Sequence, residues 1–391
     1  MKIVNIVLLI ITAIMGLIGC EKSVINEDGV IVVDVTAKYP KKNLVLQDFM
    51  DVEYIPLETS GEFICQGLVL DVTKNFIVII NRNYDGDIFI FTRNGKGVKK
   101  INRKGQGVGE YTYISGIVLD EDRGEMFVNE HLAKRIIVYD LCGNFKRVLK
   151  HNGNAMYNRI YNFDYDNLIC YDGTVNEQSF SLISKQSGNV IKNIEILFEK
   201  KIMTSLILRD EKNNRSYSAR LPYEPIIPYY NNYIITEPSS DTVYIYSSNY
   251  DMIPLIIRTP SIRSMVPEVF LCPSIVTDDF YFMEIVKKEY DFVLKRGFPN
   301  VCLMYDKKNK AIFEYIVYNE DYLNKSKTFM NTRPLGNKIA TWQNLEAYKL
   351  VDAYKKGQLK GKLKEIAATL DEESNPVIML IKYKNRHNYV R

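Results

Sequence analysis

The sequence has few of the residues that build metal centres and disulfide frameworks. Its 391 residues include six cysteines and three histidines. The cysteines that follow Cys20 are odd in number, and none has the Cys-x-x-Cys spacing of a zinc site. These counts argue against a disulfide-built fold and against a histidine-rich metal centre. Cys65, Cys170 and Cys302 stand among apolar neighbours, which indicates small core residues.

A strong charge of one sign is also lacking. The sequence has 51 Lys and Arg against 47 Asp and Glu, for a net charge of +4, and no Lys/Arg-rich run occurs. A nucleic-acid surface is therefore not expected. Glycine is modest at 21 residues, whereas tyrosine reaches 28. Abundant tyrosine and modest glycine favour strands over flexible linkers.

The N-terminus predicts export. Lys2 precedes an apolar stretch over Ile6–Ile18, shorter than the ~20 residues that a membrane-spanning helix needs. It ends in Leu17-Ile18-Gly19-Cys20, which resembles the lipobox of bacterial lipoproteins. The resemblance implies that residues 1–19 are a signal peptide and that Cys20 is lipidated. We expect an outer-membrane lipoprotein, on the periplasmic side or at the cell surface. The alternative is a simple secretory peptide that happens to contain a cysteine.

Internal repeats follow. Leu70–Ile101 and Leu119–Val148 are two copies of one unit, each with three apolar strands and a closing turn glycine, Gly95 or Gly143. The two glycines are 48 residues apart, and a weaker third copy, Phe163–Gly188, ends 45 residues further on. A fixed period of this size, with four short strands per unit, is typical of propeller blades.

Three further strand pairs extend the pattern: Tyr233–Thr236 with Thr242–Tyr246, Phe280–Met283 with Val301–Tyr305, and Lys338–Thr341 with Val377–Ile381. The sequence thus predicts an all-β fold, a six-bladed β-propeller of four-stranded antiparallel blades over 51–391. Residues 20–50 are expected to form an anchor linker and a first strand. A charged insertion lies near Arg209–Arg220, and apolar residues at helical spacing predict a helical insertion at about 344–370.

Four motifs resemble one known family: Val52–Glu58, Lys104–Tyr111, Asp241–Tyr244 and Asn375–Ile378, with Val108 where the family usually has proline. On these motifs the chain resembles the six-bladed β-propeller lipoproteins of Bacteroidetes, whose repeats are similar in style to NHL repeats. The resemblance implies a propeller fold and an envelope location. It carries no established family-wide activity or catalytic residue set.

One face of the predicted propeller is the candidate binding site. Loops that enter the innermost strand of each blade share this face with loops between the second and third strands, and ligands usually lie there. The expected ligand-binding residues are Arg82, Asn83, Tyr84, Gln106, Glu110, Tyr113, Asn129, Glu130, His131 and Glu237. Gly105, Gly107 and Gly109 either let backbone N–H groups approach a ligand or only shape the loop, with Glu110 capping backbone amides.

We predict a lipid-anchored envelope binding module rather than an enzyme. Its loop face would bind a glycan, a peptide or a partner protein, with no nucleic acid and no cofactor, because no catalytic constellation is evident. The alternative is a calcium-dependent hydrolase or lactonase with Ca²⁺ on the axis, held by Asn83, Asn129, Glu130 and Glu237. Asp71 and Asp120 repeat at equivalent blade positions and are interpreted as structural turn acceptors.

Overall fold

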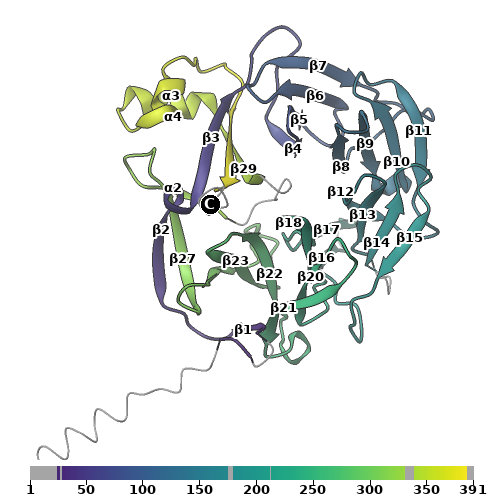
Figure 1. The fold of residues 1–391 in the computed structure, drawn as a ribbon, viewed down its shortest axis with the longest axis vertical. Coiled ribbons are helices and arrows are strands. Elements are labelled where there is room, and N and C mark those ends of the chain that lie inside the picture. The colour runs from purple at the N-terminus through teal and green to yellow at the C-terminus, as the bar shows by residue number, and fades with distance from the viewer. Residues whose placement is uncertain (1–23, 27–28, 175–178, 212, 331–338, 385–391) are drawn as a thin grey trace, which may run out of the picture.

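The computed structural model describes residues 24–26, 29–174, 179–211, 213–330 and 339–384, and it is a six-bladed β-propeller (Figure 1). The predicted fold is confirmed. Cys20 and the predicted signal peptide 1–19 lie outside the described residues. Within the described residues, no helix is both long and apolar enough to cross a membrane.

Blades 1 to 3 are the three repeats seen in the sequence, and each is a four-stranded antiparallel sheet. Blade 1 has β4 (Leu68–Val72), β5 (Phe76–Ile80), β6 (Asp87–Thr92) and β7 (Gly97–Asn102). Blade 2 has β8 (Gly116–Asp120), β9 (Glu125–Glu130), β10 (Arg135–Asp140) and β11 (Phe145–Lys150). Blade 3 has β12 (Tyr157–Asn162), β13 (Asn167–Asp172), β14 (Phe180–Ser184) and β15 (Val190–Ile194).

Blades 4 to 6 contain the later strand pairs. Blade 4 has β18 (Ile226–Tyr229), β19 (Asn232–Ile235), β20 (Thr242–Tyr246) and β21 (Met252–Thr259). Blade 5 has β22 (Val269–Val276), β23 (Phe280–Lys287), β26 (Asn300–Asp306) and β27 (Ala311–Asn319), with β28 (Ser326–Thr328) beside β27. In blade 6 the described strands are three: β29 (Ile339–Leu345), β30 (Val377–Tyr383) and β3 (Met50–Pro56). The four-stranded pattern thus describes blades 1 to 5.

The segment Ile31–Pro56, which we call the N-terminal belt, runs along the outer edges of the last three blades. Its first strand, β1 (Ile31–Asp34), pairs in parallel with β21 of blade 4, and β2 (Lys41–Val45) pairs in parallel with β27 of blade 5. A short helix, α2 (Leu46–Phe49), leads into β3, which pairs with β30 and closes the ring. The predicted first strand within 20–50 is thus represented by β1 and β2.

The core lies between the blades. Alternate side chains of β5 point to opposite faces of blade 1, because successive residues of a strand alternate. Ile77 and Ile79 pack into the cluster shared with blade 6, whereas Val78 and Ile80 pack into the cluster shared with blade 2. All four side chains are fully buried. A blade covered on both faces needs continuous apolar strands, which explains why these runs do not alternate with polar residues.

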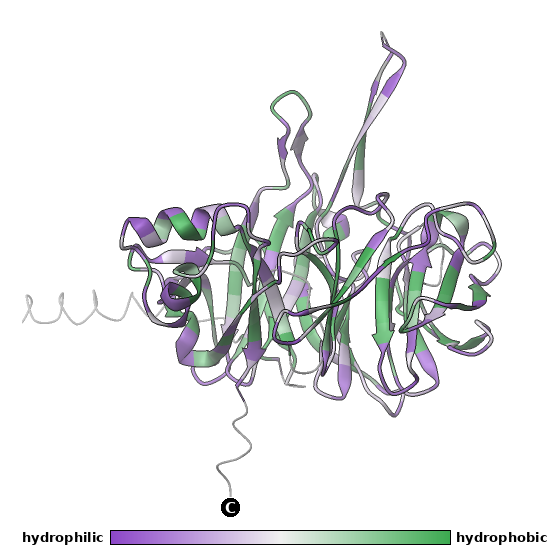
Figure 2. Ribbon diagram, turned by 90° about the horizontal axis from the view of Figure 1, so that it is seen from above, coloured by the Kyte–Doolittle hydropathy of each residue, from purple (hydrophilic) through white to green (hydrophobic). Residues whose placement is uncertain are grey.

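Two hairpins rise from one face of the ring, which we call the upper face (Figure 2). They are formed by β16 (Ser205–Asp210) with β17 (Arg215–Arg220), and by β24 (Tyr290–Asp291) with β25 (Arg296–Gly297). The predicted charged insertion is the first of them. The predicted helical insertion contains α3 (Ala347–Lys355) and α4 (Gly361–Ala367), whose buried leucines join the cluster between blades 5 and 6. Two 3₁₀ turns complete the description, η1 (His131–Ala133) and η2 (Ile262–Ser264).

Candidate functional site

The carboxylate of Glu130, at the end of β9, is buried and bonded to neighbouring protein groups. It is 1% exposed, and its Oε1 accepts hydrogen bonds from the Thr112 backbone N–H at 2.8 Å and the Thr112 hydroxyl at 2.6 Å. Its Oε2 pairs with Nε of Arg135 at 2.7 Å. Burial alone would raise the pKa of Glu130, but these hydrogen bonds outweigh it and hold the pKa below the ordinary value. The carboxylate therefore fixes the loop that precedes β8.

Asn129 and Glu237 are equally enclosed. The Asn129 amide is fully buried, donating to the Tyr157 carbonyl at 2.7 Å and lying 3.2 Å from Nε2 of His151. The Glu237 carboxylate is also fully buried, and its Oε2 lies 2.6 Å from Nζ of Lys201 and accepts the Ser179 hydroxyl at 2.6 Å. Neither group is presented to a ligand. The Lys201–Glu237 ion pair was not anticipated from the sequence, where the two residues stand in different loops.

Four more predicted residues lie in loops of blades 1 and 2. Asn83 donates to the Ile114 carbonyl at 2.6 Å, so it ties two loops together. Arg82 and Tyr84 are exposed, and a guanidinium N–H of Arg82 donates to the Tyr84 hydroxyl at 3.2 Å. Gln106 is exposed at the loop tip. Arg82, Tyr84 and Gln106 are thus accessible.

The glycine loop is closed by Glu110, as one of the two sequence interpretations expects. The Gly107 backbone N–H donates to Oε2 of Glu110 at 2.9 Å. A Cβ at Gly105 would lie 2.0 Å from the same oxygen, so a side chain there would displace the Glu110 carboxylate. The geometry therefore supports a loop-shaping role for Gly105, Gly107 and Glu110.

Tyr113 and His131 are brought together. Their rings make an edge-to-face contact with centroids 5.7 Å apart. Burial lowers the pKa of His131 below its ordinary value, and the nearby guanidinium groups of Arg220 and Arg159 lower it further. The imidazole is thus neutral near pH 7. It lies on the upper face, near Arg159 at the start of β12.

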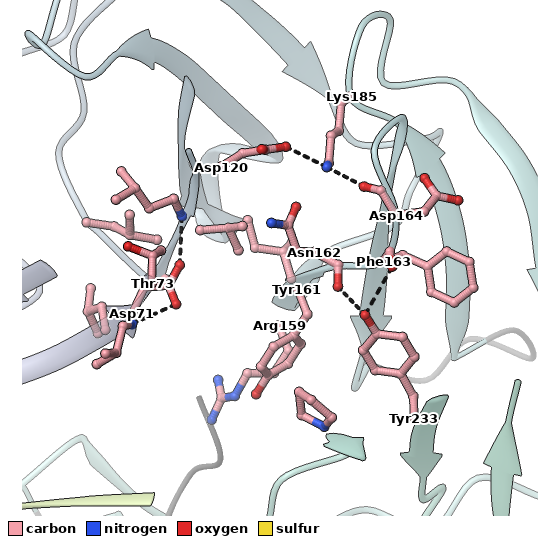
Figure 3. Close-up of a pocket in the computed structure, with 18 of the residues that line it drawn as sticks. Asp71, Thr73, Asp120, Arg159, Tyr161, Asn162, Phe163, Asp164, Lys185 and Tyr233 are labelled. Atoms are coloured by element: carbon pink, nitrogen blue, oxygen red, sulfur yellow. Dashed lines mark hydrogen bonds and ion pairs between the residues drawn. The ribbon is translucent and has the colours of Figure 1, made fainter. Parts of the chain in front are cut away.

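A cavity of about 470 Å³ lies on the propeller axis, among the innermost strands β4, β8, β12 and β18 (Figure 3). We call it the axial cavity. Residues labelled in Figure 3 around it include Asp71, Thr73, Asp120, Arg159, Tyr161, Asn162, Phe163, Asp164, Lys185 and Tyr233. None of them was predicted as a site residue, because they come from strands and turns that the sequence marks only as structural.

Asp71 lies on the wall of the axial cavity. Its Oδ2 accepts the Leu119 backbone N–H at 2.7 Å and its Oδ1 accepts that of Val72 at 2.8 Å. Burial raises the pKa of the Asp71 carboxyl to about 7, although the two N–H groups oppose the shift. The residue still contacts solvent through the cavity, but dense protein surrounds the carboxyl group. Asp71 therefore joins blade 1 to blade 2, as its structural interpretation expects.

The two cations of the cavity wall, Lys185 and Arg159, are each paired with a carboxylate. Nζ of Lys185, which is 1% exposed, lies 2.7 Å from Oδ2 of Asp120 and donates to the Asp164 carbonyl at 2.5 Å. Nε of Arg159 lies 3.1 Å from Oε1 of Glu224. These ion pairs link blade 2 to blade 3 and blade 3 to the segment before blade 4. The other carboxyl groups of the cavity wall are those of Asp71, Asp122 and Asp164.

Neutral hydrogen-bonding and aromatic groups remain. Asn162 has an exposed side chain at the cavity, and Tyr161 also lines the cavity (Figure 3). Tyr233 donates its hydroxyl to the carbonyls of Asn162 and Phe163, so its ring is fixed as part of the wall. An amide and a tyrosine ring recognise hydroxyl groups and the apolar faces of sugars.

Metal ligation has no assembled donor set in the part of the chain that the structure describes, where no group of three or more His, Cys, Asp or Glu side chains could hold an ion. The four side chains that the sequence offered as calcium ligands are likewise not assembled into one site. Asn129, Glu130 and Glu237 are engaged in separate hydrogen-bond networks, and Asn83 bonds a backbone carbonyl.

The family follows from a match over most of the chain. Residues 21–339 match the family model described as DUF5128: 6-bladed beta-propeller. The chain belongs to this six-bladed β-propeller family. No curated protein sequence matches it.

The chain is similar to several solved structures. A protein from Bacteroides fragilis NCTC 9343, named as exported, has a TM-score of 0.58 at 14% identity, with 90% of this chain and 100% of that chain covered. A member of the DUF4221 family from Bacteroides vulgatus ATCC 8482 has a TM-score of 0.39 at 10% identity, covering 86% and 98%. Streptogramin B lyase has a TM-score of 0.34 at 10% identity, covering 73% and 95%. The first likeness supports the fold, and none of these carries an activity to this chain.

Proposed function

We propose that this protein is an exported, lipid-anchored binding protein of the cell envelope that holds a neutral, hydroxyl-rich ligand, a segment of glycan, in its axial cavity. The observation that carries the proposal is the cavity itself, where the two wall cations, Lys185 and Arg159, are each paired with a carboxylate. Tyr161 adds an aromatic ring and Asn162 an exposed amide to its wall. An aromatic ring and an amide suit a sugar better than they suit an ion.

Export is supported by two independent observations. The first is the apolar stretch that ends at Cys20, which has the order of a lipoprotein signal. The second is the likeness to a Bacteroides fragilis protein named as exported. Together they support an envelope location for a glycan-binding propeller, in the outer membrane.

The test is binding of wild-type protein and two single variants to an array of neutral oligosaccharides, followed by calorimetry with the best hit. Tyr161→Ala removes a ring contact of the cavity, so affinity is expected to fall about tenfold, or about 1.4 kcal/mol. Tyr84→Ala removes an exposed tyrosine outside the cavity, and its affinity should stay within about twofold of wild type. Binding that Tyr161→Ala leaves unchanged, or no binding to any neutral oligosaccharide, would contradict the proposal.

A further inference from the structure

The two hairpins of the upper face enclose a second hollow, which shares no lining residue with the axial cavity. Leu206–Leu208 of β16 line one side, and residues 288–292 with Arg296 and Pro299, around β24 and β25, line the other. The space between them is open and measures about 910 Å³. We call it the hairpin groove. Figure 2 shows that both hairpins project well beyond the ring, so the groove is accessible to a large partner.

The groove has a free strand edge. β16 and β17 form a sheet of two strands, and within the described part of the chain no third strand pairs with β16. In an antiparallel pair, every second residue directs its N–H and C=O away from its partner strand. β16 therefore has backbone donors and acceptors along the edge that faces away from β17, and an extended peptide can add to such an edge.

Both hairpins carry exposed aliphatic side chains. Ile207 on β16 is 64% exposed and Leu208 is 42% exposed, whereas Val293 and Leu294 in the turn of the other hairpin are 89% and 67% exposed. These four aliphatic residues are on elements that contribute nothing to the propeller core. Such a concentration of exposed aliphatic side chains on projecting elements marks a contact surface.

The charge of the hairpins is positive. Residues 205–220 and 287–298 contain eight Lys and Arg against four Asp and Glu, an excess of four that equals the net charge of the whole chain. One of the acids, Asp291, is used internally, since its Oδ1 accepts the backbone N–H groups of Val293 and Leu294, each at 2.9 Å. Arg296 lines the groove, and no ion pair of its guanidinium occurs among the described residues. The surface therefore favours a negatively charged partner.

We propose that the hairpin groove binds an extended, acidic peptide segment with apolar side chains at alternate positions, which adds as a strand along β16. The free edge supplies backbone hydrogen bonds, the aliphatic residues take alternate side chains, and the basic residues attract acidic ones. A second copy of this chain is disfavoured as occupant, because two positively charged hairpin pairs would repel. This surface is independent of the axial cavity.

The test uses a fluorescein-labelled octapeptide of alternating Glu and Val, with fluorescence anisotropy as readout on the intact mature protein. Wild type should bind this peptide and should not bind the matching peptide of Lys and Val. Arg296→Glu, which reverses a charge in the groove, should weaken binding at least tenfold. Arg215→Glu makes the same charge change on β17, outside the groove lining, and should weaken binding no more than about twofold.

Two further measurements separate the alternatives. Ile207→Glu should abolish binding by placing a like charge beside the acidic peptide, while its circular dichroism stays that of wild type. The proposal is overturned if Arg296→Glu and Arg215→Glu weaken peptide binding equally. It is also overturned if the peptide does not bind while vesicles of phosphatidylglycerol and phosphatidylcholine do, since the hairpins would then be a membrane contact. Tyr161→Ala should leave peptide binding unchanged, which keeps this result distinct from that of the axial cavity.

Discussion

Asp71 and Asp120 occupy the same place in blades 1 and 2, yet they bond the next blade in different ways. Asp71 accepts a backbone N–H of β8, whereas Asp120 forms an ion pair with the ammonium of Lys185. The first carboxyl is surrounded by protein without a cation, and the second is neutralised by one. The same residue type at equivalent repeat positions therefore has opposite electrostatic costs, because its neighbour in the next blade differs.

Asp71 should make stability depend on pH between about 4 and 7. The unfolded chain releases this proton near pH 4 and the folded chain near pH 7, so the stability it contributes is complete below pH 4 and is lost as pH rises to 7. Asp71→Asn has no such proton. Its free energy of unfolding, relative to wild type, should rise by about 2 kcal/mol between pH 5 and pH 8.

Urea unfolding at pH 5, 6, 7 and 8 measures this difference. Asp140→Asn is a suitable control, because hydrogen bonds of its turn lower the pKa of that exposed carboxyl and move its titration below the range measured. Its difference from wild type should be constant from pH 5 to pH 8. A constant difference for Asp71→Asn as well would show that this carboxyl is ionised throughout.

Residue types alone could not show which polar side chains meet a ligand. Glu130, Asn129 and Glu237 were chosen because they lie in loops of one predicted face, and the structure places them in that region. Each is nevertheless buried and bonded to a neighbouring loop or strand. Loops that change direction sharply leave backbone N–H groups without partners, and nearby carboxylates and amides satisfy them. Thr112 is 18 residues from Glu130 and Ser179 is 58 from Glu237, so periodicity does not reveal these partners.

At the scale of elements, the turn between β6 and β7 shows why a blade needs glycine at one position. Gly95 has a φ of +85°, and a Cβ there would lie 2.0 Å from the carbonyl oxygen of Pro56 at the end of β3. The turn therefore packs directly against blade 6. The Gly95 N–H also donates to the Thr92 carbonyl at 2.9 Å within the turn. The glycine serves both the hairpin and the contact between blades.

Gly95→Ala is expected to lower the free energy of unfolding by about 3 kcal/mol, because the new methyl group must displace backbone. Gly124 also has a positive φ, of +62°, but a Cβ there meets nothing within 4 Å. Gly124→Ala should therefore cost only the backbone strain of about 1 kcal/mol. Chemical denaturation of both variants at one pH compares their free energies of unfolding. Equal losses would mean that blade 6 accommodates the new methyl group without destabilisation, which would contradict the prediction.

The repeats were predictable because each strand has a run of apolar residues and each hairpin a turn with glycine or asparagine. Those signals are local, and they place β5, β6 and β10 correctly. The positions of β1 and β2 were not predictable, because they pair with strands more than 200 residues later in the chain. The axial cavity and the hairpin groove likewise depend on how distant elements meet, which periodicity does not encode.

At the scale of the whole molecule, the predicted anchor would hold the propeller close to the membrane. Val24 packs against the core between blades 4 and 5, and only three residues separate it from Cys20. An extended chain spans at most ~3.6 Å per residue, so a lipidated Cys20 would place this edge of the ring within about 15 Å of the bilayer surface.

Cys20→Ser should move the protein from the membrane fraction to the soluble fraction of cells, because the acyl chains supply the attachment. Cys142→Ser changes an exposed cysteine of blade 2 in the same way and should leave the protein in the membrane fraction. Fractionation followed by immunoblotting measures both. If the Cys20→Ser protein still sediments with membranes, attachment has another cause.

The N-terminal belt also sets an order of events during folding. Residues 31–56 complete their hydrogen bonds only with β21, β27 and β30, and β30 ends at residue 383. Blades 1 to 3 consist of contiguous sequence and can assemble as soon as they emerge, but the ring must wait for the last strand. If the chain passes through a translocation channel N-terminus first, the ring therefore stays open until β30 has crossed. Closure of the propeller can then occur only on the far side of the membrane.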